Sequence, residues 1–163
     1  MNGDFKMLQN VDRRWVSRGI VFLSLTSLAG RAPAQGRREW SAKEAYDLIS
    51  ANRARVIDVR TREEWNETGV GAGVWPISMH EDRFSERLFA ARELAGERDI
   101  GLICATGGRS SYLLRALLQA GFEGYFDISE GMLGSRKGRG WVESGLPLVG
   151  ADLALKELPT ELG

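Results

Sequence analysis

One stretch decides the fold: Ile100-Gly101-Leu102-Ile103-Cys104-Ala105-Thr106-Gly107-Gly108-Arg109-Ser110. Its first four residues are a short apolar run, typical of a buried strand, and the residues after Ser110 have the spacing of an amphipathic helix. The sequence therefore predicts a strand, a glycine-containing loop and a helix, with the chain's single cysteine at the end of the strand. Backbone N–H groups and the helix dipole at such a helix N-terminus favour an anion, and they favour a thiolate over a thiol.

The residues between the cysteine and the arginine are small and uncharged, and we expect them to bind substrate: Ala105, Thr106, Gly107 and Gly108. A loop of this kind can wrap tightly and direct several N–H donors at one point above the sulfur. Arg109 can pair with an oxyanion or hold the loop itself, and Ser110 is placed to cap the following helix. The pattern suits a thiolate that attacks an anionic substrate. A structural cysteine in the core is the weaker alternative.

Strand-like and helix-like segments alternate through the rest of the chain. Strands are expected at 56–59, 74–77, 100–103 and 125–128, and helices beginning at Ser41 and over 61–65, 84–95 and 110–120. Short apolar strands that alternate with helices predict an α/β fold with a central parallel sheet and helices on both faces. Ligands bind beyond the carboxyl ends of the strands in such sheets, which is where Cys104 is placed.

Composition excludes several classes of protein. The 163 residues suffice for one domain, and 22 basic side chains balance 22 acidic ones, so no nucleic-acid partner is indicated. One cysteine cannot form an intramolecular disulfide or a cysteine-rich zinc site. The single histidine, His80, disfavours a histidine-based metal site and a cysteine–histidine protease pair. We therefore expect no metal.

Residues 1–34 have the layout of a secretory signal peptide. Arginines at 13, 14 and 18 precede an uncharged, mostly apolar stretch at 19–29, and Ala32-Pro33-Ala34 fits a cleavage site. Eleven helical residues rise about 16 Å, short of the roughly 30 Å hydrocarbon core, so we expect no stable membrane span. We expect export, to the periplasm. An uncleaved anchor and a leader without a targeting role remain alternatives.

The remaining chain is expected to hold one domain over 35–150, followed by a weakly patterned C-terminal tail over 151–163. Within the domain, Asp58 and Arg60 follow a predicted strand into the region of the site. Asp58 is expected to hold loops by hydrogen bonds rather than to touch substrate, because polar groups at buried strand ends must be satisfied. Glu63 and Glu64 are interpreted as a solvated first helical turn. Three tryptophans are expected in the core or the pocket wall: Trp65, Trp75 and Trp141.

Three segments together resemble the rhodaneses, the thiosulfate sulfurtransferase-like superfamily. The loop at 104–110 is similar to the family's Cys-x-x-Gly-x-Arg-Ser segment, and residues 57–65 are similar to its Asp-Val-Arg-x-x-x-Glu-aromatic segment. Residues 131–147 resemble its closing Gly-x…Trp…Gly-x-Pro stretch. The resemblance covers roughly residues 39–149, in family order. Where family members usually have a histidine after the aromatic residue, this chain has Thr68 to Gly73 without one.

The resemblance implies a sulfurtransferase with a central parallel sheet. Cys104 would attack the sulfane sulfur of a small anionic donor such as thiosulfate, and sulfite would leave. The resulting persulfide would pass its outer sulfur to cyanide or a thiol. Cys104 and Arg109 would be the catalytic residues, with Asp58 and Arg60 supporting the site, and no cofactor is implied.

Two rival interpretations stay open at this point. A cysteine phosphatase loop places five residues between cysteine and arginine, whereas four are present here, and Ile103 stands where phosphatases usually have histidine. This makes a phosphatase the weaker alternative. A sulfur carrier or partner-binding module, which would exchange sulfur with a protein partner, retains the same loop and is the main alternative to an enzyme.

Overall fold

The computed structural model describes residues 38–163, so the predicted signal peptide lies outside the described residues. The elements, in chain order, are β1 (Glu39–Trp40), α2 (Ala42–Ser50), β2 (Ala54–Asp58), α3 (Arg62–Thr68), β3 (Val70–Gly71), β4 (Trp75–Pro76), α4 (Phe84–Ala95), β5 (Asp99–Ile103), α5 (Gly108–Gln119), β6 (Tyr125–Ile128), α6 (Gly140–Glu143), β7 (Leu148–Val149), α7 (Ala151–Lys156) and the 3-10 helix η2 (Thr160–Leu162). Among these residues no helix is both long enough and apolar enough to span a bilayer.

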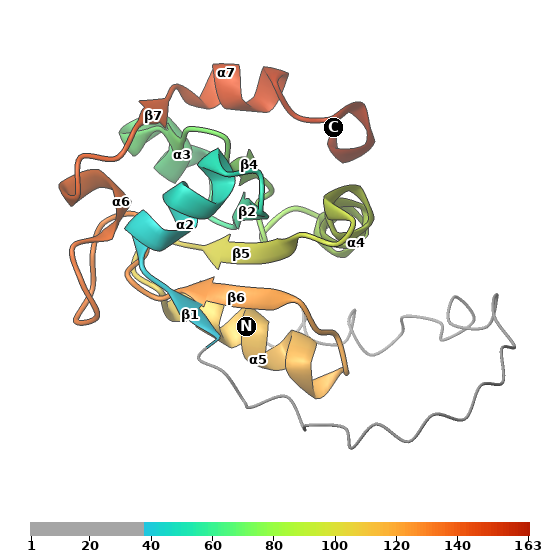
Figure 1. Cartoon of the computed structure of the whole chain (residues 1–163). Helices are drawn as coiled ribbons and strands as arrows, with labels where there is room; N and C mark the ends of the chain where they lie inside the picture. The colour runs from blue at the N-terminus through green and yellow to red at the C-terminus, as the bar shows by residue number, and fades with distance from the viewer. Residues whose placement is uncertain (1–37) are drawn as a thin grey trace, which may run out of the picture. The chain divides into compact units, whose positions relative to one another are not determined.

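Five strands form the central sheet, in the order β1-β6-β5-β2-β4 (Figure 1). Every neighbouring pair in this sheet is parallel. The carboxyl ends of β2 and β5 are in register, with Asp58 opposite Ile103. The residues that follow these strands therefore emerge at one edge of the sheet, as predicted for the site.

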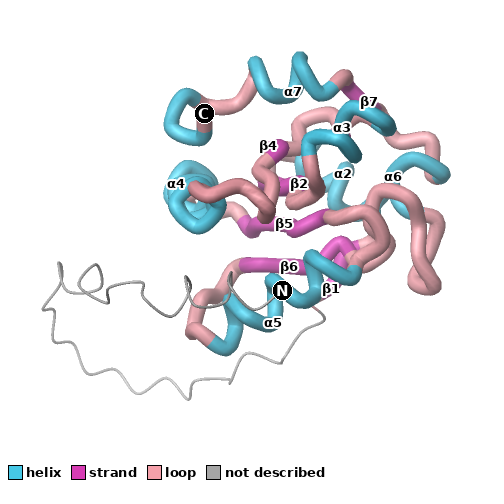
Figure 2. The backbone as a smooth tube through the Cα atoms, turned by 180° about the vertical axis from the view of Figure 1, so that it is seen from behind, coloured by secondary structure: helices cyan, strands magenta, loops and turns pink. Residues whose placement is uncertain are grey.

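Helices cover both faces of the sheet. Successive residues of its strands point to opposite sides, so each strand contributes side chains to both faces. Ile100 and Leu102 of β5 belong to one apolar cluster, which α4, α5 and η2 complete. Ile103 belongs to a second cluster, which includes residues of α2, α3, α6 and α7. Figure 2 shows α5 and α2 on opposite sides of β5 and β6. The predicted α/β class, with helices on both faces of a parallel sheet, is confirmed.

Local sequence signals explain where α2 begins and where the sheet ends. The Ser41 hydroxyl accepts the Glu44 N–H at 3.1 Å, and the Glu44 carboxylate accepts the Ser41 N–H at 2.7 Å. This capping box satisfies two N–H groups that the helix itself leaves unpaired. Pro76 lies on β4, an edge strand of the sheet, where the missing N–H leaves no neighbouring strand unpaired.

Two segments outside the predicted strands and helices have regular structure. The glycine-rich stretch 68–73 contains β3, which pairs with β7 in a small antiparallel sheet. The expected tail from residue 151 is part of the folded unit, because it forms α7 and η2 and buries Leu162 completely against the α4 side of the core.

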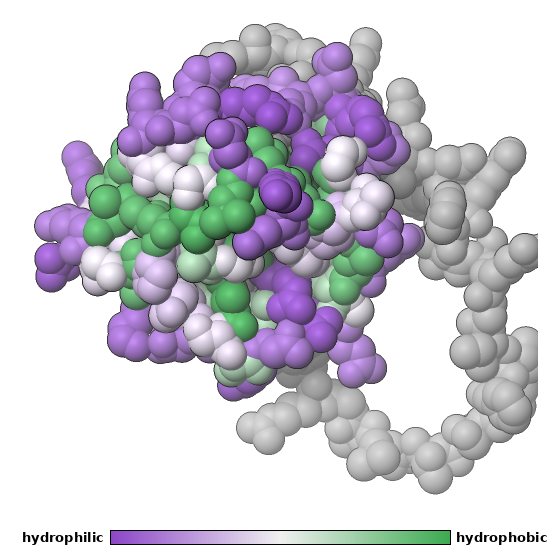
Figure 3. Space-filling model, turned by 90° about the horizontal axis from the view of Figure 1, so that it is seen from above, coloured by the Kyte–Doolittle hydropathy of each residue, from purple (hydrophilic) through white to green (hydrophobic). Residues whose placement is uncertain are grey.

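Two apolar side chains near the C-terminal end of the chain are exposed: Leu148 of β7 and Leu153 of α7. Figure 3, which views the molecule from above the orientation of Figure 1, shows hydrophobic residues bordered by hydrophilic ones.

Candidate active site

Cys104 lies directly after β5, at the carboxyl edge of the sheet. It is 1% exposed and belongs to the same apolar cluster as Leu102, beneath α5. The helix begins at Gly108, two residues before the predicted start, with Gly107 as its N-cap. The thiol and the N-terminus of a twelve-residue helix are therefore separated by only three residues.

The loop after Cys104 is held by the turn that follows β6. The Met132 N–H donates to the Cys104 carbonyl and the Leu133 N–H donates to the Ala105 carbonyl, both at 2.9 Å. Gly107 adopts a φ of +84°, and a Cβ there would lie 2.3 Å from the Ser129 carbonyl oxygen. Only glycine permits this backbone conformation and this close approach without strain. The loop is therefore fixed by backbone contacts on both its sides.

Gly107→Ala is expected to destabilise the protein by about 2–4 kcal/mol. A left-handed φ costs an alanine ~1–2 kcal/mol, and the clash with the Ser129 carbonyl adds a similar amount. Gly108→Ala is the matched control, because a Cβ at Gly108 meets no heavy atom within 4 Å. We expect it to change the free energy of unfolding by less than about 1 kcal/mol. Urea unfolding of the two variants measures the difference, and equal losses would contradict this account of the loop.

Ser110 does not cap α5, so that expectation was wrong. Its hydroxyl is completely buried and lies 3.4 Å from Cys104 Sγ and 3.3 Å from the Gly107 carbonyl oxygen. One hydroxyl proton serves one acceptor at a time, so Ser110 can donate to the sulfur or to the carbonyl. A donor at this distance stabilises negative charge on the sulfur.

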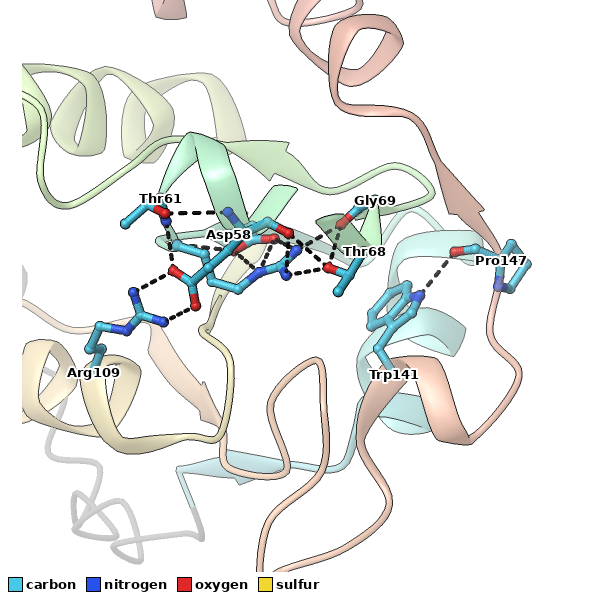
Figure 4. A network of polar contacts seen from close by, with 9 residues as sticks. Asp58, Thr61, Thr68, Gly69, Arg109, Trp141 and Pro147 are labelled. Carbon is cyan, nitrogen blue, oxygen red and sulfur yellow. Dashed lines mark hydrogen bonds and ion pairs between the residues drawn. The ribbon is translucent and has the colours of Figure 1, made fainter. Parts of the chain in front are cut away.

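Arg109 is paired with a carboxylate from another element. Its Nη1 lies 2.7 Å from Glu64 Oε2, and its Nη2 donates to Oε1 of the same side chain (Figure 4). Glu64 also accepts the Thr61 N–H at 3.0 Å, in a capping box that starts α3. The interpretation of Glu64 as a solvated residue was therefore wrong. The spacing Thr61-x-x-Glu64 is a capping-box pattern. In the sequence, this pattern was the signal that the Glu64 carboxylate would bond with the start of α3.

This ion pair changes the titration of both side chains. Hydrogen bonding to Arg109 is the main cause that lowers the pKa of Glu64 to about 2. The same bond is the main cause that raises the pKa of Arg109, and charges on Cys104 and Asp58 add to the effect.

Glu64→Gln is expected to lower the free energy of unfolding by about 1 kcal/mol at neutral pH. Because the folded-state pKa of Glu64 lies below the ordinary 4.5, the ion pair stabilises the fold above about pH 4.5, and this contribution is lost as the pH falls toward 2. The difference between variant and wild type should therefore disappear in acid. Unfolding followed from pH 2 to 7 checks this, with Glu67→Gln on the exposed side of α3 as control. A difference that persists at pH 2 would contradict it.

Asp58 and Arg60 form a buried ion pair at the end of β2. Both are completely buried, and Arg60 Nη2 lies 2.7 Å from Asp58 Oδ2 while Nε lies 3.0 Å from both carboxylate oxygens. The remaining guanidinium N–H groups donate to Thr68 Oγ1 at 2.7 Å, Gly69 O at 2.8 Å and Glu64 O at 3.3 Å (Figure 4). All five donors of Arg60 are occupied. Arg60 therefore joins the end of β2 to the end of α3 and has no donor left for a substrate.

The other residues singled out in the sequence lie in the core or in loops. Trp65 and Trp141 are buried, and Trp141 Nε1 donates to the Pro147 carbonyl at 2.9 Å (Figure 4). Trp75 is partly buried, and His80 lies in the loop before α4, where its N–H contacts the Ser78 hydroxyl. Within residues 38–163, no three or more histidine, cysteine or acidic side chains gather in a way that could hold a metal ion.

A thiol at the carboxyl edge of a parallel sheet, under the N-terminus of the following helix, defines an α/β domain with a cysteine loop. The rhodanese-like domain model matches residues 41–136, and the chain belongs to this family. An uncharacterized RP600 homolog of Rickettsia rickettsii is 29% identical over 119 residues, which cover 64% of this chain and 90% of that protein. An uncharacterized Rickettsia montanensis protein, described by its place in the dnaA 5′ region, matches to the same extent.

Solved structures share the fold. The crystal structure of the Alr3790 protein from Anabaena has a TM-score of 0.53 at 22% identity and covers 76% of this chain and 96% of that one. The solution structure of the rhodanese-like domain of the same Anabaena protein has a TM-score of 0.51 at 20% identity, with coverage of 76% and 85%. At these identities the likeness shows the fold alone.

Proposed function

We propose that the protein is a sulfurtransferase that moves a sulfane sulfur from a small anionic donor, such as thiosulfate, to a thiol or cyanide through a Cys104 persulfide. The main support is the loop between Cys104 and α5. The three N–H groups of this loop and the first N–H group of α5 donate to no acceptor among residues 38–163: Ala105, Thr106, Gly107 and Gly108. Unpaired N–H groups beside a thiol, at a helix N-terminus, form a site suited to an anion.

The transfer requires two displacements at sulfur. The Cys104 thiolate attacks the outer sulfur of the donor, a new S–S bond forms, and the old S–S bond breaks with its electron pair on departing sulfite. The acceptor then attacks the outer sulfur of the persulfide, and Cys104 leaves as the thiolate again. The loop N–H groups, the helix dipole and the Ser110 hydroxyl stabilise the negative charge that stays on the protein's sulfur atoms throughout.

Arg109 has two roles in this proposal. Two of its five N–H donors hold Glu64, which fixes the loop against the start of α3. The other three have no acceptor among the described residues and remain available for the anionic end of the donor. Asp58 and Arg60 support the site from β2 without touching the substrate.

Thiocyanate formation by the full chain from thiosulfate and cyanide tests this function. Steady turnover supports a sulfurtransferase that uses a small donor. If thiosulfate fails to load Cys104 while a persulfide-bearing protein loads it, the alternative role as a carrier with a protein partner is supported instead. Export to the periplasm, proposed from residues 1–34, is tested separately by the cell fraction in which the protein is found.

A further inference from the structure

The charged side chains at the candidate site cancel one another in two pairs, both drawn in Figure 4. Arg109, near the start of α5, donates two N–H groups to Glu64, with Nη1 at 2.7 Å from Oε2. Arg60 is paired with Asp58 at 2.7 Å, and both of these side chains are completely buried. Each pair has a formal charge of zero. The two arginines therefore present no net positive charge to a substrate.

The loop that follows the thiol adds no charged side chain. It consists of small uncharged residues up to the first residue of α5, so an anion there meets N–H groups and the dipole of the helix. That dipole is equivalent to about half a positive charge at the helix N-terminus. The attacking Cys104 thiolate carries a full negative charge. Each further negative charge on the donor is therefore brought toward a site without net positive charge.

Glu64 is the residue that keeps the Arg109 charge from attracting anions fully. The side chains of Arg109 and Glu64 are 31% and 28% exposed, so the pair lies at the surface, where a donor can reach it. Three N–H groups of Arg109 are available to a donor, but the Glu64 carboxylate stays within hydrogen-bond distance of the same guanidinium. A donor at Arg109 is attracted by one charge and repelled by the other. Specificity often depends on such a repulsive group.

We propose that Glu64 sets the donor specificity by charge, so that the site takes sulfur more efficiently from singly charged sulfane donors than from doubly charged thiosulfate. The inference rests on the proposed sulfur transfer and names its preferred donor class, an organic thiosulfonate or persulfide with one negative charge. Thiosulfate still loads Cys104, but with a lower kcat/KM. Glu64 selects between donors and takes no part in either displacement.

The transfer is the same for both kinds of donor. With methanethiosulfonate, the Cys104 thiolate attacks the outer sulfur, a new S–S bond forms, and the bond to the sulfonyl sulfur breaks with its electron pair on departing methanesulfinate. Thiosulfate carries one more negative charge and releases sulfite. The total charge is the same before and after each reaction, and neither needs a further oxidant or reductant. The two donors therefore form a pair that differs in charge.

The ratio of kcat/KM for methanethiosulfonate to kcat/KM for thiosulfate, measured on the full chain with cyanide as acceptor, tests the inference. The intrinsic reactivities of the two donors cancel when this ratio is compared between variants. Glu64→Gln removes the negative charge and should lower the ratio about fivefold, mainly through a lower KM for thiosulfate. Glu64→Asp keeps the charge on a shorter side chain, so its ratio should stay within about twofold of wild type.

The matched control is Glu63→Gln. Glu63 is the exposed neighbour of Glu64 on the first turn of α3, and the carboxylate bonded to Arg109 is that of Glu64. The same loss of charge at Glu63 should change the ratio by less than about twofold, because solvent screens it. A Glu64→Gln ratio equal to that of wild type would overturn the inference. Equal losses of kcat/KM with both donors would also overturn it, since Glu64 would then only hold the loop.

Alkylation of Cys104 measures the same charge effect without a sulfur donor. Cys104 is the single cysteine, so intact mass reports its reaction with neutral iodoacetamide and with singly charged iodoacetate. The rate ratio of iodoacetate to iodoacetamide should rise about threefold in Glu64→Gln and change little in Glu64→Asp. If this ratio rises while neither sulfur donor loads Cys104, the charge selection stands and the proposed function fails. If both donors turn over and neither ratio responds to Glu64→Gln, the function stands and the charge selection fails.

Discussion

Cys104→Ser is expected to abolish thiocyanate formation and to leave the fold intact. A serine hydroxyl at this position cannot form a persulfide and stays protonated, so the first displacement cannot occur. Serine is smaller than cysteine, and its hydroxyl can bond with that of Ser110, 3.4 Å from the present sulfur. We therefore expect the free energy of unfolding to change by about 1 kcal/mol or less.

The matched control for this variant is Ser111→Ala. Ser111 is the neighbour of the site serine, and its hydroxyl bonds with the Gly108 carbonyl on the helix rather than with the sulfur. This variant should turn over like wild type, whereas Cys104→Ser should fall to the rate without protein. Thiocyanate formed by folded Cys104→Ser at the wild-type rate would remove the cysteine from the mechanism.

Arg60→Met is expected to destabilise the protein by about 3–5 kcal/mol, the largest stability effect proposed for this chain. The substitution leaves the Asp58 carboxylate completely buried without its cation, which costs more than the ion pair itself contributes. It also removes the bonds to Thr68 Oγ1 and the Gly69 carbonyl, which hold the end of α3. Urea unfolding followed by circular dichroism measures the loss.

Two variants show whether the uncompensated charge is the cause. Arg62→Met removes an arginine that is 54% exposed and paired with Glu81, and it should cost less than about 1 kcal/mol. Asp58→Asn added to Arg60→Met should recover part of the lost stability, since it removes the unpaired charge. A loss in Arg60→Met no greater than that in Arg62→Met would contradict the importance of the buried pair.

The central fold could be predicted because its strands and helices carry strong local patterns. The apolar runs of β2, β5 and β6 and the capping box of α2 are visible in the sequence itself. The pairing of β3 with β7 was not predictable, because two-residue strands have no periodicity and their partners lie far apart in the chain. The packing of 151–163 was missed for a similar reason. Small residues such as Ala151 and Ala154 give only a weak apolar periodicity, and Leu162 is buried by elements far away in the sequence.

In the site, too, the features set by neighbouring residues could be predicted, whereas contacts between residues far apart in the sequence could not. Cys104 at the end of a strand and before a helix follows from local sequence. The Arg109–Glu64 bond joins residues 45 positions apart, so no spacing rule indicates it. Only the packing of α5 against the sheet brings the buried Ser110 hydroxyl within 3.4 Å of Cys104 Sγ.

The most direct test of transfer through Cys104 is the intact mass of the full chain after incubation with thiosulfate and again after addition of cyanide. We expect a gain of one sulfur atom, its removal by cyanide, and no gain in Cys104→Ser. Unchanged mass in wild type with thiosulfate, or the same gain in Cys104→Ser, would contradict transfer from a small anionic donor through a Cys104 persulfide.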